Sequence, residues 1–181
     1  MQAVPRLLLV WHSRTGLARQ MADALEAGAH AAAGEMGGAV VVDRRRARDA
    51  SSADLLRADG FLFCAPENLA STSGEMLEFF HSNYYSAFEA PHGAGGFSET
   101  SRLVGRPAGI AVAAGSDGSG AARQMERICR GWRLRMVGDT LIHKNGEVQT
   151  PAAILHPKTL SVDGRDRCLE LGGLVAATLL L

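Results

Sequence analysis

Short apolar runs alternate with segments of helical periodicity along the whole chain, and this alternation limits the possible fold more than any other feature. Strands that are apolar on both faces need cover on both faces. Repeated strand–helix units of this kind indicate an α/β protein, with a parallel sheet between two layers of helices. The expected strands are Leu7–Trp11, Ala39–Val42, Phe61–Ala65, Pro107–Ala114 and part of Leu134–His143.

Apolar residues three and four positions apart mark the helices between these strands. Glycines and polar capping residues mark their ends. Pro66–Ser73 and Gln149–Leu160 lack such periodicity and contain proline, which predicts loops. The expected helices are Leu17 to about Ala33, a short one from Ser51 to Arg57, Gly74–Tyr85, Ala121–Trp132 and Val162–Leu181.

The turn after the first strand places hydroxyl side chains and a glycine at the start of a helix. A helix N-terminus presents unpaired N–H groups and a partial positive charge. Ser13 and Thr15 add hydroxyl donors, and Gly16 lets the backbone approach a ligand closely. The turn therefore predicts a small anion site, of the kind that holds a phosphate. It has neither the lysine of a Walker loop nor a G-x-G-x-x-G fingerprint.

A run of charged residues follows the second expected strand: Asp43-Arg44-Arg45-Arg46, with Arg48 close behind. Arginines at this place in a dinucleotide-binding fold hold the 2′-phosphate of NADPH. Because the glycine fingerprint is missing, we favour a solvated loop at the sheet edge.

Composition excludes several classes of protein. Lys+Arg and Asp+Glu are equal at 19 each, so no broad basic surface for nucleic acid is expected. The 3 cysteines are widely spaced and the histidines have no helix-face spacing, which predicts neither disulfides nor a metal site. No apolar run is long enough for a signal peptide or a membrane span. We expect a cytoplasmic protein without a membrane partner.

The chain length suits a single domain over residues 1–181. Residues 87–105 form one irregular stretch, which contains Gly93-Ala94-Gly95-Gly96. Its length is unusual inside a compact domain. We expect a flexible insertion there, and rank a tolerated insertion slightly ahead of a lid.

Three polar loops, each after an expected strand, resemble those of the flavodoxin-like family of FMN proteins. Within that family the resemblance is to the NAD(P)H-dependent oxidoreductase and tryptophan-repressor-binding flavoprotein branch. The matching motifs are Ser13-Arg14-Thr15-Gly16, Ala65–Leu69 running through Ser73-Gly74 into an aromatic-ended helix, and Ala114–Gly118. The resemblance implies a five-stranded parallel sheet of order 2-1-3-4-5 with helices on both faces.

The same resemblance assigns site residues. Ser13, Arg14, Thr15, Gly16, Leu17 and Ala18 would hold the FMN phosphate. The isoalloxazine ring would lie along Pro66, Glu67, Asn68 and Leu69, with Gly115, Ser116 and Asp117 at its pyrimidine edge or the ribityl chain.

Two departures from the family pattern shape the functional expectation. Ala18 stands where relatives often have a third hydroxyl, and Leu69 where many have an aromatic residue. With neutral charge and no stacking platform, the chain resembles a reductase more than an electron-carrier flavodoxin. The resemblance implies hydride transfer from NADH or NADPH through FMN to a quinone or similar acceptor, without a catalytic side chain, in a homodimer or homotetramer.

Two alternatives remain open. The sequence Ala114-Gly115-Ser116-Asp117-Gly118 fits a variant nucleophile elbow, which would make Ser116, Asp139 and His156 the triad of an α/β serine hydrolase. That interpretation leaves the Ser13–Gly16 turn unexplained. The other alternative is a flavodoxin-like domain with weak or no flavin binding, acting as an interaction or electron-transfer module.

Overall fold

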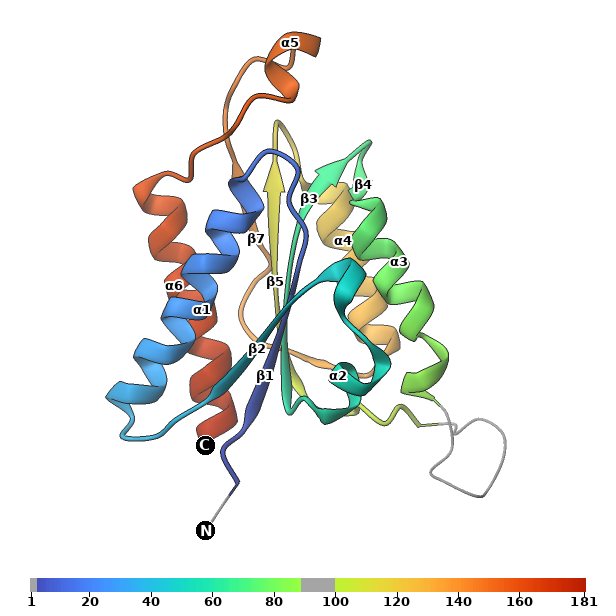
Figure 1. Ribbon diagram of the computed structural model, residues 1–181, viewed down its shortest axis with the longest axis vertical. Helices are drawn as coiled ribbons and strands as arrows, with labels where there is room; N and C mark the ends of the chain where they lie inside the picture. Colours follow the sequence, from blue (N-terminus) through green and yellow to red (C-terminus); the bar gives the residue numbers. More distant parts are fainter. Residues whose placement is uncertain (1–2, 89–99) are drawn as a thin grey trace.

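A parallel sheet forms the middle layer of the protein, and helices cover both of its faces (Figure 1). The computed structural model describes residues 3–88 and 100–181. Most of the insertion expected at 87–105 lies outside these residues. The described ends of that stretch are packed, since Ala87, Ser101 and Leu103 are buried.

The sheet has the order β2-β1-β3-β5-β6, and β7 also pairs with β5. All of these pairings are parallel. With β6 and β7 together as the fifth strand, the predicted order 2-1-3-4-5 is confirmed. The fifth strand is divided into two: β6 pairs with the start of β5, and β7 pairs with its end. The strands are β1 (Arg6–Trp11), β2 (Val41–Arg46), β3 (Gly60–Asn68), β4 (Ser71–Thr72), β5 (Pro107–Ala114), β6 (Arg135–Met136) and β7 (Leu141–Lys144).

The second strand corrects the prediction. It covers Val41–Arg46, so the charged run expected to be a solvated loop pairs in register with β1. An edge strand has a neighbour on one side only, and charged side chains there protect its free edge. The charges also find partners that local sequence does not reveal, such as Asp23 and Glu26 of α1 for Arg44.

The helices largely follow the prediction, with one addition. A short helix, α5, lies in the expected loop 149–160; the Thr150 side chain caps it and Pro151 opens it. The helices are α1 (Leu17–Glu35), α2 (Ser52–Arg57), α3 (Gly74–Asn83), α4 (Ser119–Gly131), α5 (Pro151–Ile154) and α6 (Val162–Leu180), with short 3₁₀ turns η1 (Ala47–Asp49) and η2 (Tyr85–Ala87).

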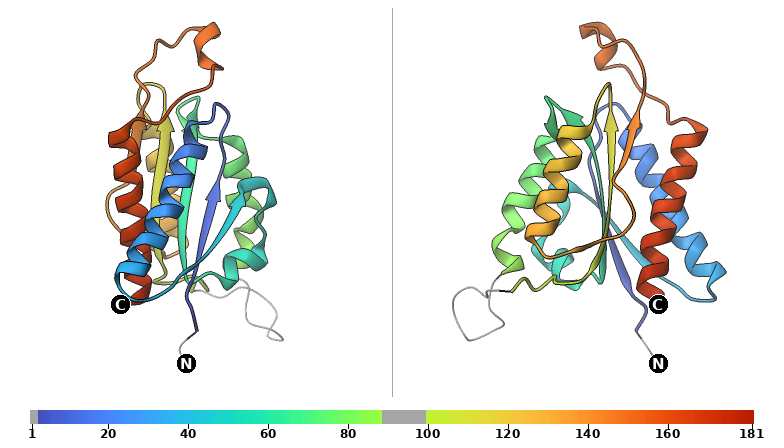
Figure 2. Two further views of the ribbon diagram at one scale, coloured as in Figure 1. Left: turned by 60° about the vertical axis from the view of Figure 1, so that its left-hand side comes forward. Right: turned by 180° about the vertical axis from the view of Figure 1, so that it is seen from behind.

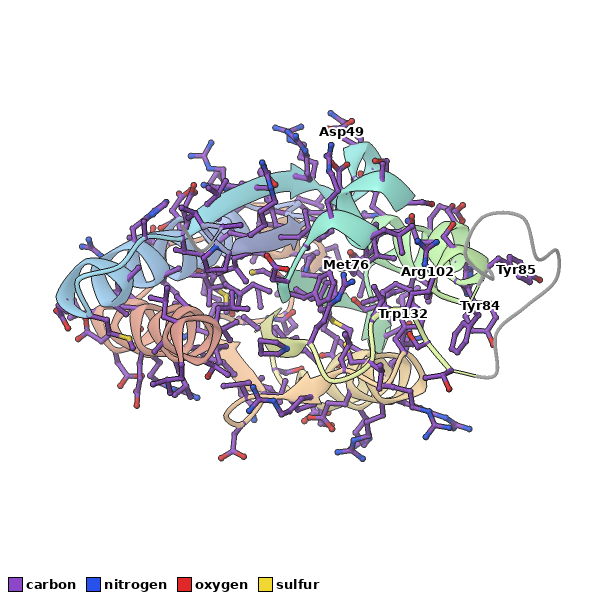
Figure 3. All side chains as sticks on the ribbon, turned by 90° about the horizontal axis from the view of Figure 1, so that it is seen from below. Asp49, Met76, Tyr84, Tyr85, Arg102 and Trp132 are labelled. Carbon is purple, nitrogen blue, oxygen red and sulfur yellow. The ribbon has the colours of Figure 1, made fainter. Side chains whose placement is uncertain are left out.

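Alternate residues of each strand feed two separate apolar cores. Leu7, Leu9 and Leu62 pack under α1 and α6, whereas Leu8 and Phe63 belong to the core under α3 and α4. This division explains why the strands are apolar throughout. Seen from below, Met76 and Trp132 lie inside the second core, while Tyr84 and Tyr85 lie outside it at the end of α3 (Figure 3).

Helices α1 and α6 lie side by side on one face of the sheet (Figure 2). Glycines allow this close contact: a Cβ on Gly28 would lie 2.0 Å from the Leu169 carbonyl oxygen, and one on Gly172 would lie 2.0 Å from that of Leu25. Among the described residues, no helix combines the length and the apolar character needed to cross a membrane.

Candidate functional site

Three loops and one longer segment meet at the carboxyl edge of the sheet. The loops follow β1, β3 and β5, and parallel strands bring the residues after their carboxyl ends to one edge. The segment 145–161 connects β7 to α6, carries α5, and extends beyond the same edge (Figures 1 and 2). We call this segment the strap.

The loop after β1 is shaped to receive an anion. Gly16 has φ of 90°, a left-handed conformation that favours glycine, and its N–H donates to the Ser13 hydroxyl oxygen at 3.1 Å. Helix α1 then begins without a side-chain cap and without an acidic residue in its first turn. Its N-terminal partial charge is therefore left for an external anion.

The loop after β3 differs from the prediction, because it is a hairpin. Strand β3 continues through Asn68 and pairs antiparallel with β4. The two turn residues, Leu69 and Ala70, have φ of 52° and 59°. Such conformations are costly for residues with a Cβ and concentrate at functional sites. Leu69 is fully exposed at the tip, so it contacts neither the cavity nor the core.

Two polar atoms of this hairpin are buried without a partner among the described residues: Glu67 Oε1 and Asn68 Oδ1. The other carboxylate oxygen of Glu67 accepts from the Gly118 N–H at 2.8 Å, which ties the hairpin to the loop after β5. A buried acceptor without a donor is unfavourable. These two atoms therefore mark a place where a ligand's N–H group would be stabilised.

The loop after β5 is more exposed. Gly118, with φ of 81°, begins α4, and Ser116 and Asp117 lie on the surface. The Ser119 hydroxyl donates to the Asp117 carboxylate at 2.5 Å, and this bond holds the pKa of Asp117 below its usual value.

The strap crosses the loop after β1. The Lys158 N–H donates to the Thr15 carbonyl oxygen at 2.8 Å. The Gln20 side chain binds the strap twice, donating to the Lys158 carbonyl oxygen at 2.7 Å and accepting from the Leu160 N–H at 3.1 Å. The Lys158 ammonium is buried, where it pairs with Glu147 and donates to the Ala153 carbonyl oxygen. The strap is therefore fastened by backbone and side-chain bonds.

A cavity of about 150 Å³ lies between the loops and the strap. Glu67 and Asn68 line it, and the Gln149 side chain lies so close to Gly115 that a Cβ there would be 2.5 Å from Gln149 Oε1. The predicted site residues that line this cavity are Arg14, Thr15, Leu17, Pro66, Glu67, Asn68 and Gly115.

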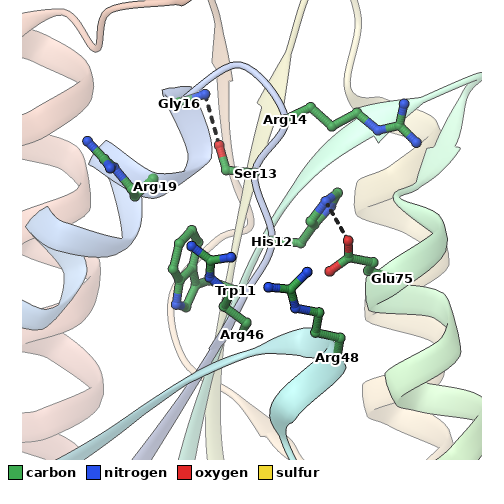
Figure 4. Close-up of a pocket in the computed structure, with 9 residues that line it drawn as sticks. All are labelled: Trp11, His12, Ser13, Arg14, Gly16, Arg19, Arg46, Arg48 and Glu75. Atoms are coloured by element: carbon green, nitrogen blue, oxygen red, sulfur yellow. Dashed lines mark hydrogen bonds and ion pairs between the residues drawn. The ribbon is translucent and has the colours of Figure 1, made fainter.

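The other predicted residues lie elsewhere. Ser13 and Gly16 line a second pocket, on the β2 side of the same loop (Figure 4). Ala18 is 1% exposed and packs in the core under α1, because it lies on the helix face turned to the sheet. Leu69, Ser116 and Asp117 are exposed.

Sequence reasoning missed the strap residues that line the cavity. They are Asn145, Gln149, Ile154, Leu155 and Lys158. None belongs to a motif, and their place follows from tertiary contacts. The one local signal is Lys158, the one residue of 149–160 with a formal charge.

The hydrolase triad is not assembled. Ser116 lies beyond the carboxyl end of β5, Asp139 lies between β6 and β7, and His156 is exposed on the strap. No hydrogen bond joins any two of these side chains within residues 3–88 and 100–181. A serine without a base in reach is not an activated nucleophile.

The residues present fit the chemistry of FMN, but the cavity that they line is too small for it. The start of α1 suits a phosphate, and the buried acceptors Glu67 and Asn68 suit the N–H group of a flavin ring. Pockets for ligands of this size measure roughly 300–1,000 Å³. The cavity between the loops therefore has to enlarge by displacement of the strap before a flavin enters.

Comparison with known structures decides the fold. An archaeal flavodoxin superposes with a TM-score of 0.70 at 14% identity, and the match covers 97% of this chain and 99% of that one. The chain has the flavodoxin fold. An oxidoreductase from Corynebacterium diphtheriae gives a TM-score of 0.67 at 16% identity, covering 98% of this chain and 97% of that chain.

A third structure with this flavodoxin fold is a WrbA-like protein from Agrobacterium tumefaciens. It has a TM-score of 0.62 and 15% identity, and the match covers 97% of this chain and 98% of the other. No protein-family model matches the sequence, and neither does any curated protein. The likeness therefore lies in the fold.

Proposed function

We propose that the protein binds FMN at the carboxyl edge of its sheet and works as a flavin oxidoreductase. The observation that carries the proposal is the pair of buried acceptors without a partner, Glu67 Oε1 and Asn68 Oδ1, in a cavity that also reaches the anion-binding loop. FMN suits both features, because its ring offers an N–H donor at one end of the molecule and its phosphate lies at the other end.

FMN supplies hydride and electron transfer when it is bound, and the protein supplies position and electrostatics. Backbone N–H groups at the start of α1 would hold the phosphate, together with the hydroxyl of Thr15. Glu67 would accept from the ring's N–H, and the Gly118 N–H holds its other carboxylate oxygen.

We further propose the electron path that this fold and site suit: NADH or NADPH delivers hydride, and a quinone-like acceptor receives it. FMN enters the site from the edge that the strap covers. A homodimer or homotetramer, in the cytoplasm, is the form in which we expect the protein to act. A flavodoxin-like module without flavin is the alternative, favoured by the small volume of the cavity.

Titration of the purified chain with FMN and with riboflavin, followed by quenching of flavin fluorescence, tests the proposal. Riboflavin lacks the phosphate, so we expect FMN to bind at least tenfold more tightly, in keeping with charge-assisted hydrogen bonds of about 1.5–3 kcal/mol. Glu67→Gln should weaken both flavins alike, because it alters the ring end only. No quenching at high micromolar FMN would overturn the proposal in favour of the module.

A further inference from the structure

The pocket on the β2 side of the anion-binding loop is separate from the cavity described above. It has a volume of about 320 Å³, which lies in the range of small-ligand pockets. It is formed by four parts of the chain: the end of β1 with its loop, the first turn of α1, the end of β2 with η1, and the start of α3. Its lining residues are Trp11, His12, Ser13, Arg14, Gly16, Arg19, Arg46, Arg48 and Glu75.

Charge in this pocket is strongly one-sided. Four arginines line it, from three elements, and Glu75 is the carboxylate among the lining residues. Within residues 3–88 and 100–181, Arg14, Arg19 and Arg46 have no carboxylate within 4.0 Å. Arg48 has a distant one, with Nε 3.8 Å from Asp49 Oδ1 at the surface.

Two neighbouring arginines of β2, Arg44 and Arg45, do have carboxylate partners. Arg44 binds Asp23 at 2.6 Å and Glu26 at 3.0 Å, and Arg45 lies 3.8 Å from Asp54. In the same run, Arg46 lies at the wall of the pocket with no carboxylate partner in the part of the chain that the structure describes. Gathering unpaired like charges costs stability unless an anion joins them.

One of these arginines, Arg46, is held in place by an aromatic ring. The Arg46 guanidinium lies 5.3 Å from the centre of the Trp11 ring, and that of Arg48 points toward the same hollow (Figure 4). A stacked guanidinium keeps its planar set of donors oriented, so less freedom is lost on binding. Guanidinium groups that line one pocket suit a phosphate monoester, which carries two charges and accepts bidentate bonds.

We propose that this pocket binds the 2′-phosphate of NADPH and makes the protein select NADPH over NADH. The dinucleotide would then reach the flavin past the anion-binding loop. This inference rests on the proposed oxidoreductase function. The anion site itself stands on the arginines and the pocket, and is tested without flavin.

His12 gives the site a built-in reporter. Its side chain is 11% exposed, and its Nε2 lies 3.4 Å from Glu75 Oε1 of α3. Burial lowers its pKa; Glu75 opposes this, and the charges of Arg14, Arg48 and Arg46, from the loop, η1 and β2, lower it further. A bound phosphate dianion offsets the three arginine charges, and so raises the pKa of His12.

The first experiment uses the full chain without flavin and the probes 2′-AMP, 5′-AMP and adenosine. We expect 2′-AMP to bind, to raise the His12 pKa measured by NMR, and to do so more strongly than 5′-AMP; adenosine should do neither. The double variant R46A/R48A should weaken 2′-AMP about 100-fold, at roughly tenfold for each charge-assisted contact. Arg45→Ala is the matched control, because it removes the same charge from the same run outside the pocket.

The second experiment uses the FMN-loaded protein. R46A/R48A should raise the KM for NADPH at least tenfold, and leave the KM for NADH and the kcat unchanged. Equal effects on both dinucleotides, equal binding of 5′-AMP, or an unmoved His12 pKa would overturn the inference. Failure to bind FMN would overturn the proposed function instead, and the 2′-AMP titration would still decide the anion site.

Discussion

The two hollows beside the Ser13–Gly16 loop differ in how they treat positive charge. On the β5 side, the single lysine of the cavity wall, Lys158, is buried and paired with Glu147. On the β2 side, Arg19 and Arg46 are exposed and unpaired among the described residues, as is Arg14, which borders both hollows. The paired cation fastens the strap, whereas the unpaired cations leave an anion site. Charge therefore contributes to structure on one side and to binding on the other.

Polar groups without a partner among the described residues sharpen this difference. The β5 side presents acceptors, Glu67 Oε1 and Asn68 Oδ1, and the β2 side presents donors from arginines. The loop between them serves both sides, since Arg14 and the turn that ends at Gly16 border each hollow. We therefore expect the flavin ring on the β5 side of this loop and the 2′-phosphate of NADPH on its β2 side.

Replacement of Gly16 by valine should have the largest effect, because it breaks the wall that both sides share. A Cβ in the left-handed conformation at φ of 90° costs on the order of 1–3 kcal/mol, so the loop would relax to another shape. We expect the dissociation constants of FMN and of 2′-AMP to rise at least tenfold each. Gly34→Ala, in α1 with nothing within 4 Å of the added Cβ, is the control. Normal binding by Gly16→Val would show that the loop shape is irrelevant.

A comparison of Lys158→Met with Arg46→Ala separates the structural cation from the binding cation. Loss of the Lys158 bonds to Glu147 and Ala153 should lower the free energy of unfolding by about 2 kcal/mol. Arg46→Ala should change it by no more than about 0.5 kcal/mol, as is usual for exposed side chains. Urea unfolding monitored by circular dichroism measures both. Equal losses would remove the distinction between the two sides.

Salt should act on the two sides unequally. Exposed charges are screened over about 10 Å at 0.1 M salt, whereas a buried pair is screened much less. We expect 2′-AMP to bind severalfold more weakly at about 0.5 M than at about 0.05 M sodium chloride. FMN quenching should change less, since its ring end rests on buried acceptors. A salt-independent affinity for 2′-AMP would contradict binding by the arginines.

We expect the smallest effect in the dependence of stability on pH, where His143 serves as the control for His12. Burial lowers the pKa of both His12 and His143 from 6.5, so the unfolded chain takes up protons first as the pH falls. Stability is therefore constant above about pH 7 and falls as the pH drops below 6.5. Bound 2′-AMP should reduce the part of this fall that His12→Gln removes, and leave the His143→Gln part unchanged. Thermal unfolding between pH 5 and pH 7.5 is the check; an equal response of both histidines would place the anion elsewhere.

Much of the fold follows from local pattern, because buried strands have to be apolar on both faces. Leu7–Trp11 and Phe61–Ala65 show this. The helix that begins at Leu17 was predicted from its own pattern, apolar residues three and four positions apart. The second strand was predicted at Ala39–Val42, but its charged continuation to Arg46 was not, because the arginines find their partners on α1 and α2, far away in sequence. The strap was missed for the same reason: Lys158 meets Thr15 and Glu147 only in the folded chain.

The site was predicted in part. Turn chemistry pointed to the loop after β1, and seven of the residues that the family resemblance assigned to the site line the cavity. Leu69 and Ala18 lie outside the cavity, because the hairpin turns Leu69 outward and the side chain of Ala18 meets the sheet. The missing glycine motif argued against a phosphate site at the arginines of β2 and η1. Only the folded chain shows that these side chains gather around one pocket.

Titration of the FMN-saturated protein with 2′-AMP tests the two-sided loop most directly. Calorimetry gives the stoichiometry of 2′-AMP, and flavin fluorescence reports whether FMN stays bound. We predict one 2′-AMP per chain, with the flavin retained and its fluorescence still quenched. Release of FMN in proportion to the 2′-AMP added would contradict this, because it would mean that both phosphates compete for one site.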